Sequence, residues 1–400
     1  MGLAVRLTLL PKADIGDIDL FVSWVHGIAR YGLPSAYDAK LTFPPVMSYI
    51  WWLLAAVEPA FQTATDSSDQ TVRVLMKVPA TLADFGLAGL VAYALRHRPR
   101  WAVAAGVVIL LHPAVIDVSA WMGQYESIYV LFALAAAILA TSGRYGWAAA
   151  LIALSLMTKP QALTMLVPFV ALFWATGGWR GLARAAAIGA AVIVILWLPF
   201  VAADGPANYL GNVAHYQGQG HAALSVWAWN IWWLVQEFAV GGFAYDSVPI
   251  VGPLNFKHLG FLVAAVLGSF IAVAVIRDPR PRTFVLALAA SVLVAFSFLT
   301  SMHERYSYGA FVFLLLLLPE ARMRWLSVGL GVVVTLNLLV SVPPTTEIDS
   351  VLRATRPLGV LGSIAMLGIT GVVYTMLRRT AAERLAPSTR EPRGRSASAG

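Results

Sequence analysis

The feature that most constrains this chain is a succession of long apolar stretches, separated by short segments that hold most of the charge. A helix needs about 20 apolar residues to cross the hydrocarbon core of a bilayer. Only 12% of the residues are charged, against roughly 25% in ordinary soluble domains. The sequence therefore excludes a soluble enzyme and predicts an all-α, polytopic membrane protein. We expect spans near residues 72–95, 101–115, 124–141, 145–158, 161–176, 184–203, 258–276, 283–301, 306–319, 325–342 and 357–377.

A short apolar stretch at residues 2–11 precedes these spans. It lacks the small-residue cleavage site of a signal peptide and is too short to cross a bilayer comfortably, so we expect the sequence to begin inside the first span. Counting it gives about 11–12 transmembrane helices with both termini on one side. The chain has no cysteine, which excludes disulfides, thiol catalysis and cysteine-ligated metals.

The basic residues are concentrated in alternate loops. One set of loops and the C-terminal tail hold 17 basic and four acidic residues, and the rest of the chain holds 11 basic and 16 acidic. The positive-inside rule places the basic side and both termini in the cytoplasm. We therefore interpret the net charge of +8 as orientation in the plasma (inner) membrane, not as nucleic-acid binding. The arginines between the spans are Arg96, Arg98, Arg100, Arg144, Arg180, Arg184, Arg277, Arg280, Arg282, Arg322 and Arg324.

Residues 1–379 are predicted to form one transmembrane domain with two structured external loops. The first loop covers about 12–70 and contains an apolar stretch at 44–62. A crossing there would put the arginines of 96–100 outside, so we expect an interfacial or re-entrant helix with Trp51 and Trp52 at headgroup level. The second loop, about 204–256, is rich in aromatic residues and is expected on the membrane surface. Residues 380–400 are predicted to be a disordered, basic cytoplasmic tail.

Polar residues gather on the expected external side. Asp17 and Asp19 stand two residues apart in GDIDLFVSW, where they suit a general base with a neighbouring group, ligands of a hard metal, or surface charges at a helix start. Trp121, Gln124 and Tyr125 in WMGQYE can stack on and hydrogen-bond a sugar, or form an interfacial aromatic belt.

Three further basic residues lie on the same side. Lys159, before a proline, can pair with an anionic ligand, with Asp117 or with Glu126, or snorkel to the membrane surface. His303 and Arg305 in SMHERY offer donors for a phosphate, or belong to an ordinary turn. Lys77 and Asp84, seven residues apart in one span, are expected to be structural partners of each other.

The ordered combination of these motifs resembles the GT-C superfamily of integral-membrane glycosyltransferases. The chain is similar to members that use polyprenyl-phosphate sugars, particularly bacterial mannosyltransferase-like ones, and the resemblance covers nearly its whole length. The motifs that carry it are GDIDLFVSW, YGLPSAYDAKLTFPPVMSY, KVPATLADF, WMGQYES, KPQ, SVWAWNIWW and MHERY.

The resemblance implies a role for each matching residue. Asp17, in the Gly16-Asp17-Ile18-Asp19 setting, would be the catalytic base and Asp19 its neighbour. His303 and Arg305 would contact the donor phosphate, with Lys159 as a further phosphate contact.

The same resemblance implies a sugar or acceptor site. Its expected residues are Trp121, Gln124, Tyr125, Glu126 and Gln161, although Glu126 stands where the family commonly has Asp, and Pro160 is inserted between Lys159 and Gln161.

These roles imply inverting transfer of a hexose, with mannose favoured, to a glycan or lipid-linked glycan on the extracytoplasmic face. A monophosphate leaving group needs no metal, and Asp17 and Asp19 are the expected ligands if a divalent ion is used. The expected partners are the polyprenyl-phosphate sugar, the glycan or glycolipid acceptor and membrane lipids, without nucleic acid. The alternative is a multi-pass lipid or polysaccharide transporter or flippase, which paired half-repeats with broken helices would favour.

Overall fold

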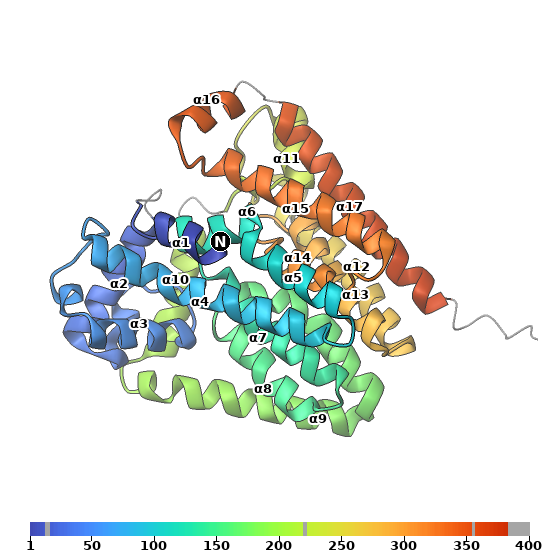
Figure 1. Ribbon diagram of the computed structural model, residues 1–400, viewed down its shortest axis with the longest axis horizontal. Coiled ribbons are helices and arrows are strands. Elements are labelled where there is room, and N and C mark those ends of the chain that lie inside the picture. The colour runs from blue at the N-terminus through green and yellow to red at the C-terminus, as the bar shows by residue number, and fades with distance from the viewer. Residues whose placement is uncertain (13–16, 219–221, 354–356, 383–400) are drawn as a thin grey trace, which may run out of the picture.

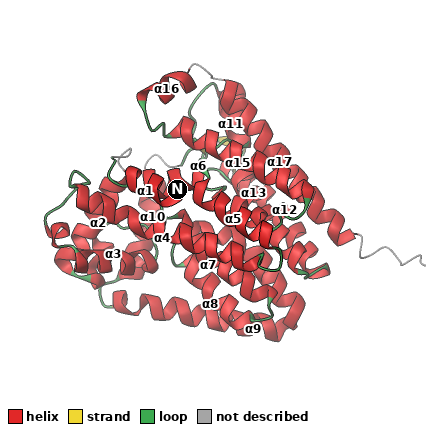
Figure 2. Ribbon diagram, in the orientation of Figure 1, coloured by secondary structure: helices red, strands yellow, loops and turns green. Residues whose placement is uncertain are grey.

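The computed structural model describes residues 1–400 except 13–16, 219–221, 354–356 and 383–400, and its described part is almost entirely helical (Figures 1 and 2). This confirms the all-α prediction. Asp14, Gly16 and the predicted tail beyond Ala382 lie outside the described residues. The helices of the first half are α1 (Gly2–Leu9), α2 (Asp17–Tyr31), η1 (Leu33–Ala39), α3 (Pro45–Val57), η2 (Pro59–Gln62), α4 (Gln70–Ala94), α5 (Pro99–Leu111), α6 (Pro113–Ile116), η3 (Asp117–Trp121), α7 (Glu126–Thr141), α8 (Tyr145–Leu156), η4 (Pro160–Met165) and α9 (Leu166–Val201).

The second half continues the helical bundle and adds four very short strands. Its helices are α10 (Gly205–Gly218), α11 (Ile231–Val235), η5 (Gln236–Val240), α12 (Phe256–Arg277), α13 (Pro281–Phe298), α14 (Tyr308–Leu315), α15 (Ala321–Ser341), α16 (Thr346–Arg353) and α17 (Pro357–Ala382). The strands are β1 (Ser225–Val226), β2 (Pro249–Val251), β3 (Leu254–Asn255) and β4 (Met302–His303). β1 pairs in parallel with β4, and β2 pairs antiparallel with β3.

Six helical stretches in the described part are long and apolar enough to span a membrane, and a seventh is formed if the bent pair Pro99–Leu111 and Pro113–Trp121 counts as one span. The chain is thus a multi-pass membrane protein. By length, these spans are fewer than the 11–12 expected. The apolar stretches near 124–141, 145–158 and 306–319 form helices of only 16, 12 and 8 residues. The helices end earlier than the apolar stretches because turns follow or precede them, and the residues of these turns are also largely apolar.

Two expected spans, near 161–176 and 184–203, are joined in α9. Gly178 divides this helix with a non-helical conformation (φ 54°, ψ −151°). A positive φ of this kind favours glycine. The two halves meet at that kink beside α8 (Figure 1).

The segments flanking the bundle form a separate packed unit at one end of the molecule, where α2, α3 and α10 lie together (Figure 1). Its core is aromatic and contains Phe21, Trp24, Phe43 and Trp51. Trp51 is fully buried, whereas Trp52 is 42% exposed, so the prediction of both rings at headgroup level is wrong for Trp51. Its indole is held inside because Nε1 donates to the hydroxyl of Tyr125 at 3.1 Å.

The expected partnership of Lys77 and Asp84 is also wrong. Asp84 instead accepts from Arg6 of α1 at 2.7 Å and from the hydroxyls of Ser119 and Ser127, both at 2.5 Å. Lys77 Nζ donates to the carbonyl of Lys12 at 2.8 Å. The sequence spacing put Lys77 and Asp84 on one face of the same helix. A charged residue inside a span, however, needs a partner from a neighbouring segment, and for Asp84 that partner is Arg6 of α1.

Candidate active site

The candidate site forms where three segments distant in sequence meet beside the α2–α3 unit. Arg305, just after β4, lies at its centre and is 8% exposed. Its Nη1 lies 2.5 Å from Glu304 Oε1, its Nε 3.3 Å from Glu126 Oε1, and its Nη2 3.6 Å from Asp17 Oδ2. One guanidinium therefore faces three carboxylates from three parts of the chain.

Lys159 adds a second buried cation to this cluster. It precedes Pro160, which begins η4, and it is 4% exposed. Its Nζ lies 2.5 Å from Glu126 Oε1, so one carboxylate oxygen is shared by Lys159 and Arg305. Burial lowers the pKa of Lys159, and Glu126 opposes that effect. Of the alternatives for Lys159, the structure brings it to Glu126.

The charge of Arg305 is firmly retained. Burial by itself would lower the pKa of this guanidinium, but the nearby carboxylates, Glu304 first and then Glu126, raise it further than burial lowers it. The cluster consequently sets the Arg305 cation and the Lys159 amine against Asp17, Glu126 and Glu304. A bound anion at Arg305 would compete with these carboxylates for the guanidinium.

Asp17 is the first residue of α2, where a negative charge is favoured by the helix dipole. Gln124 Nε2 donates to its Oδ2 at 2.6 Å. Within the described residues no group donates to Oδ1, and the side chain is 41% exposed. Asp17 thus has one oxygen fixed by an amide and the other open, which is the arrangement a general base requires.

Asp19 does not join Asp17. Residues two apart in a helix project about 200° from each other, and Asp19 Oδ1 accepts from the backbone N and the hydroxyl of Ser67 at 2.8 and 2.6 Å. The two carboxylates therefore engage different partners and do not form a chelating pair. Among the described residues, no group of three or more His, Asp and Glu side chains is arranged to hold a metal ion.

The turn between η3 and α7 aims Gln124 at Asp17. Gly123 adopts φ +64°, and a Cβ at this position would lie 2.8 Å from the side chain of Ile18. Both the backbone conformation and the close approach of α2 require glycine here. The turn can therefore bring Gln124 to Asp17 only because residue 123 has no side chain.

One aromatic residue of the same motif, Tyr125, is placed differently from the sugar-stacking expectation. Tyr125 is fully buried in the aromatic core, where its hydroxyl donates to the Met76 carbonyl at 3.1 Å. Trp121 is partly buried, and Lys77 Nζ lies 5.8 Å from the centroid of its ring. The structure thus makes Tyr125 a support of the site rather than a surface open to a ligand.

His303 lies on β4 at the edge of the cluster. β4 pairs with β1, with His303 opposite Val226, so β1, which belongs to the segment predicted as the second loop, holds this histidine in position. Its Nδ1 lies 3.9 Å from Glu304 Oε2, its ring centroid lies 5.1 Å from that of Tyr306, and its side chain is 14% exposed. The segment 204–256, which we expected on the membrane surface, therefore contacts the candidate site through β1.

Several polar atoms in the predicted site residues are buried without a hydrogen-bond partner among the described residues: Trp121 Nε1, Glu126 Oε2, Gln161 Oε1 and Arg305 Nε, the last of which still lies 3.3 Å from Glu126 Oε1. Leaving such an atom unsatisfied costs about 1–3 kcal/mol, and native proteins normally satisfy these atoms with protein, water or ligand. Their occurrence in residues chosen from the sequence for ligand binding supports a site that receives a polar molecule.

An open cavity of about 470 Å³ adjoins the cluster along α2. Leu20 and Trp24 line it from the face of α2 that also carries Asp17, since these positions follow at three and seven residues. Its polar lining includes Lys40, Asn212, His215 and Tyr216. Burial raises the pKa of Tyr216, and the Asp17 carboxylate adds to this rise, so Tyr216 links the cavity to Asp17.

Sequence reasoning missed two contributors to this site. Glu304 was part of a recognised motif but received no role, although its carboxylate is the nearest to Arg305. Tyr216 stands on α10 in a segment with no recognisable motif, and only its aromatic, sparsely charged surroundings distinguish it.

Comparisons with known proteins add little to this geometry. No protein-family model matches the chain, and no curated protein matches it. Among solved structures, the chain is similar to ArnT from Cupriavidus metallidurans bound to undecaprenyl phosphate, at 14% identity and a TM-score of 0.46, over 96% of this chain and 76% of that one. A likeness at this level carries no argument about function.

Proposed function

We propose that this protein is an inverting glycosyltransferase that moves a hexose from a polyprenyl-phosphate donor to a glycan or lipid-linked glycan. The observation that carries the proposal is the state of Asp17: a half-exposed carboxylate with one oxygen fixed by Gln124, beside a buried cationic cluster and an open polar cavity. The ordered motifs of the GT-C resemblance contain these same residues.

The reaction is a single displacement. Asp17 takes the proton of the acceptor hydroxyl, the hydroxyl oxygen forms a bond to C1 of the donor sugar, and the bond from C1 to the phosphate oxygen breaks with its electron pair leaving on the phosphate. Arg305 and His303 hold the phosphate charge. Arg305 Nε lies 3.3 Å from Glu126 Oε1 but makes no hydrogen bond among the described residues, and this supports the role because a phosphate oxygen would accept one from it.

The cavity beside α2 is assigned to the acceptor. Its lining of hydroxyl, amide and imidazole groups with one indole is the mixture that binds a carbohydrate. We further propose mannose as the sugar, the plasma (inner) membrane as the location, the termini in the cytoplasm and the site on the extracytoplasmic face. These finer assignments rest on the motif resemblance and on the distribution of arginines.

The experiment compares two aspartates of one helix. Purified protein is supplied with radiolabelled polyprenyl-phosphate mannose or glucose and with envelope glycolipids from a strain that lacks the gene. Asp17→Asn is expected to lower transfer by about 10²–10⁴-fold, the usual contribution of a general base. Asp19→Asn, the matched control, removes a carboxylate that bonds only Ser67 in the described chain and is expected to retain most activity.

Near wild-type transfer by Asp17→Asn would remove the base assignment. A wild-type protein that binds either donor lipid but forms no new glycosidic product would instead favour the transporter alternative. The choice between mannose and glucose is read from the same assay, because the two donors differ only in the sugar.

A further inference from the structure

A second possible ligand site lies at the opposite, arginine-rich end of the bundle. α15 and α17 pack side by side there (Figure 1), and a groove of about 670 Å³ runs between them. Its walls are apolar for most of its length. The lining residues away from the charged end are Trp325, Leu326, Gly368, Gly371, Val372 and Thr375.

Two glycines of α17 leave the groove open. A Cβ added to Gly368 or Gly371 would meet nothing within 4 Å, so the space in front of both positions is unfilled by protein. Trp325 stands beside it and is 76% exposed. Because α15 and α17 are both candidate membrane spans, this face lies against lipid chains rather than water.

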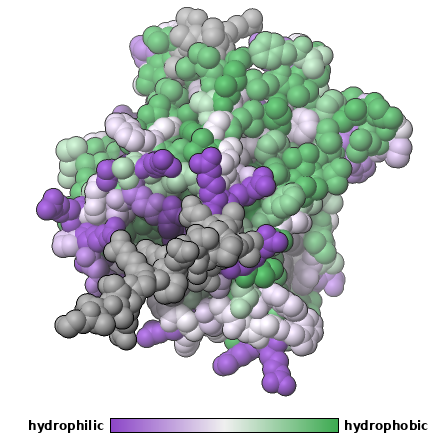
Figure 3. Space-filling view, turned by 90° about the vertical axis from the view of Figure 1, so that its right-hand side faces the viewer, coloured by the Kyte–Doolittle hydropathy of each residue, from purple (hydrophilic) through white to green (hydrophobic). Residues whose placement is uncertain are grey.

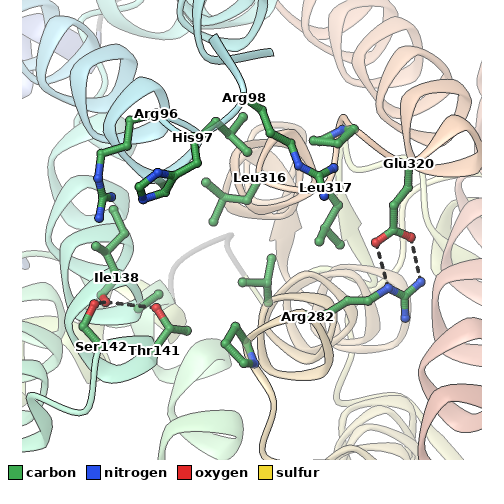
Figure 4. A pocket seen from close by; sticks show the side chains of 16 residues that line it. Arg96, His97, Arg98, Ile138, Thr141, Ser142, Arg282, Leu316, Leu317 and Glu320 are labelled. Atoms are coloured by element: carbon green, nitrogen blue, oxygen red, sulfur yellow. Dashed lines mark hydrogen bonds and ion pairs between the residues drawn. The ribbon is translucent and has the colours of Figure 1, made fainter. Parts of the chain in front are cut away.

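The groove ends in a cluster of arginines. An adjoining hollow of about 660 Å³ shares Arg322 and Arg379 with the groove and is also lined by Arg280 and Arg282. Arg280 pairs with Asp278 at 2.7 Å. Arg282 pairs with Glu320 at 2.7 Å, as Figure 4 shows. Within the described chain, Arg322 and Arg379 have no carboxylate partner. The cluster therefore has a surplus of two positive charges.

These arginines lie at the height where lipid headgroups are found. α13 begins at Pro281, α15 begins at Ala321, and α17 ends at Ala382, so three membrane helices begin or end beside the cluster. Figure 3 shows hydrophilic side chains on this end of the molecule beside a broad apolar surface. Charged groups at one end of an apolar groove match the two parts of a phospholipid.

We propose that this groove binds one anionic phospholipid of the surrounding bilayer. An acyl chain lies along Gly368 and Gly371 between α15 and α17, and the phosphate lies between Arg322 and Arg379. Guanidinium groups bind phosphate oxygens through paired, charge-assisted hydrogen bonds, and basic pockets between membrane helices suit anionic headgroups. The apolar floor distinguishes this ligand from free phosphate, which has no chain to bury there.

The test measures thermal unfolding and native mass spectra of the delipidated, full-length protein in an uncharged detergent. Phosphatidylglycerol and phosphatidylcholine with identical chains are added separately. Wild-type protein is expected to retain and be stabilised by phosphatidylglycerol in preference to phosphatidylcholine. Inorganic phosphate is expected to have no effect at the same concentration.

Three variants locate the site. Arg322→Gln/Arg379→Gln is expected to weaken phosphatidylglycerol binding roughly thirty-fold, from about fivefold per arginine. Arg180→Gln/Arg277→Gln, the matched control, removes two exposed arginines that do not line the groove and should bind like wild type. Gly371→Leu keeps the arginines but fills the groove, and it should weaken binding of both lipids.

The proposal is overturned if wild-type protein binds the two phospholipids equally, or if the preference survives Arg322→Gln/Arg379→Gln. It is also overturned if inorganic phosphate stabilises the protein as phosphatidylglycerol does, or if Gly371→Leu binds lipid like wild type. Because every variant changes an exposed position, loss of folding is not expected to obscure the result.

Discussion

Single residues decide the electrostatics of the candidate site. The motif order pointed to Asp17, Gln124, Glu126, Lys159 and Arg305, and the structure brings these five side chains into one connected cluster. The short motifs predicted that these residues lie together because each motif contains a charged or polar residue. Such a residue is costly in a membrane protein unless it has a partner. Their catalytic and binding roles remain proposals.

Other residues of the same motifs were not placed by the sequence. Asp19 and Tyr125 are close to site residues in the chain but point elsewhere. Asp19 accepts from Ser67, and Tyr125 lies in the aromatic core. A helix sends successive side chains in different directions, so a motif of adjacent residues cannot all face one ligand. Periodicity could have separated Asp19 from Asp17, but only packing reveals that Tyr125 is enclosed.

The buried pair of Lys159 and Glu126 gives a prediction about stability. Lys159→Met leaves Glu126 buried with one cation fewer, and breaking a buried pair in this way costs about 3–5 kcal/mol. Lys159→Met/Glu126→Gln removes both charges and should recover much of that loss. Thermal unfolding of the detergent-purified proteins measures both. A single variant as stable as wild type, or a double variant less stable than the single, would contradict the pairing.

At the scale of elements, the turns between helices determine the geometry of the site. Hydropathy predicted where most helices run, and the structure has a helix in each expected apolar stretch. It did not predict that several of these helices are short, nor that α9 joins two stretches at Gly178. Such breaks depend on backbone conformation and on neighbouring helices. The mean hydropathy of a segment contains neither, so it cannot predict them.

The Gly123 turn gives a prediction that separates backbone strain from crowding. Gly123→Ala places a methyl group 2.8 Å from Ile18 and is expected to displace Gln124 from Asp17. Gly143→Ala is the matched control, because Gly143 also has a positive φ of 75° but nothing within 4 Å of its added Cβ.

The two variants should differ mainly in transfer activity. Each incurs a backbone cost of about 1 kcal/mol or more from alanine at positive φ, visible as a lower melting temperature. Only Gly123→Ala should also lose most of the transfer from the polyprenyl-phosphate donor. Equal activity losses in the two variants would show that the Gly123 turn does not position the site.

At the scale of the whole molecule, the candidate site and the arginine-rich groove lie at opposite ends of the bundle. α4 runs from Gln70, near the α2–α3 unit, to Ala94, just before Arg96 and Arg98. α7 runs in the same sense from Glu126 of the candidate site to Thr141. Arg96, Arg98 and Thr141 line one hollow together with Arg282 of the arginine cluster. The positive-inside rule assigns the arginine-rich end to the cytoplasm. We therefore expect the α2–α3 unit and Asp17 to lie outside.

This orientation is directly testable because the chain has no cysteine. Thr63→Cys and Ser142→Cys introduce single thiols at exposed positions at the two ends. A maleimide that cannot cross membranes should label Thr63→Cys in intact cells, and should label Ser142→Cys only after permeabilisation. The reverse pattern would invert the topology and place the candidate site in the cytoplasm.

The sequence by itself determined that the chain is a helical, multi-pass membrane protein and which ionisable residues need partners. These conclusions follow from the energy of transferring apolar and charged groups between water and lipid, a property of each residue in its local segment. Only the tertiary structure decided which charges pair. Asp84 binds Arg6 rather than Lys77, and Arg305 gathers Asp17, Glu126 and Glu304. Pairing depends on which helices pack together, and no single segment contains that information.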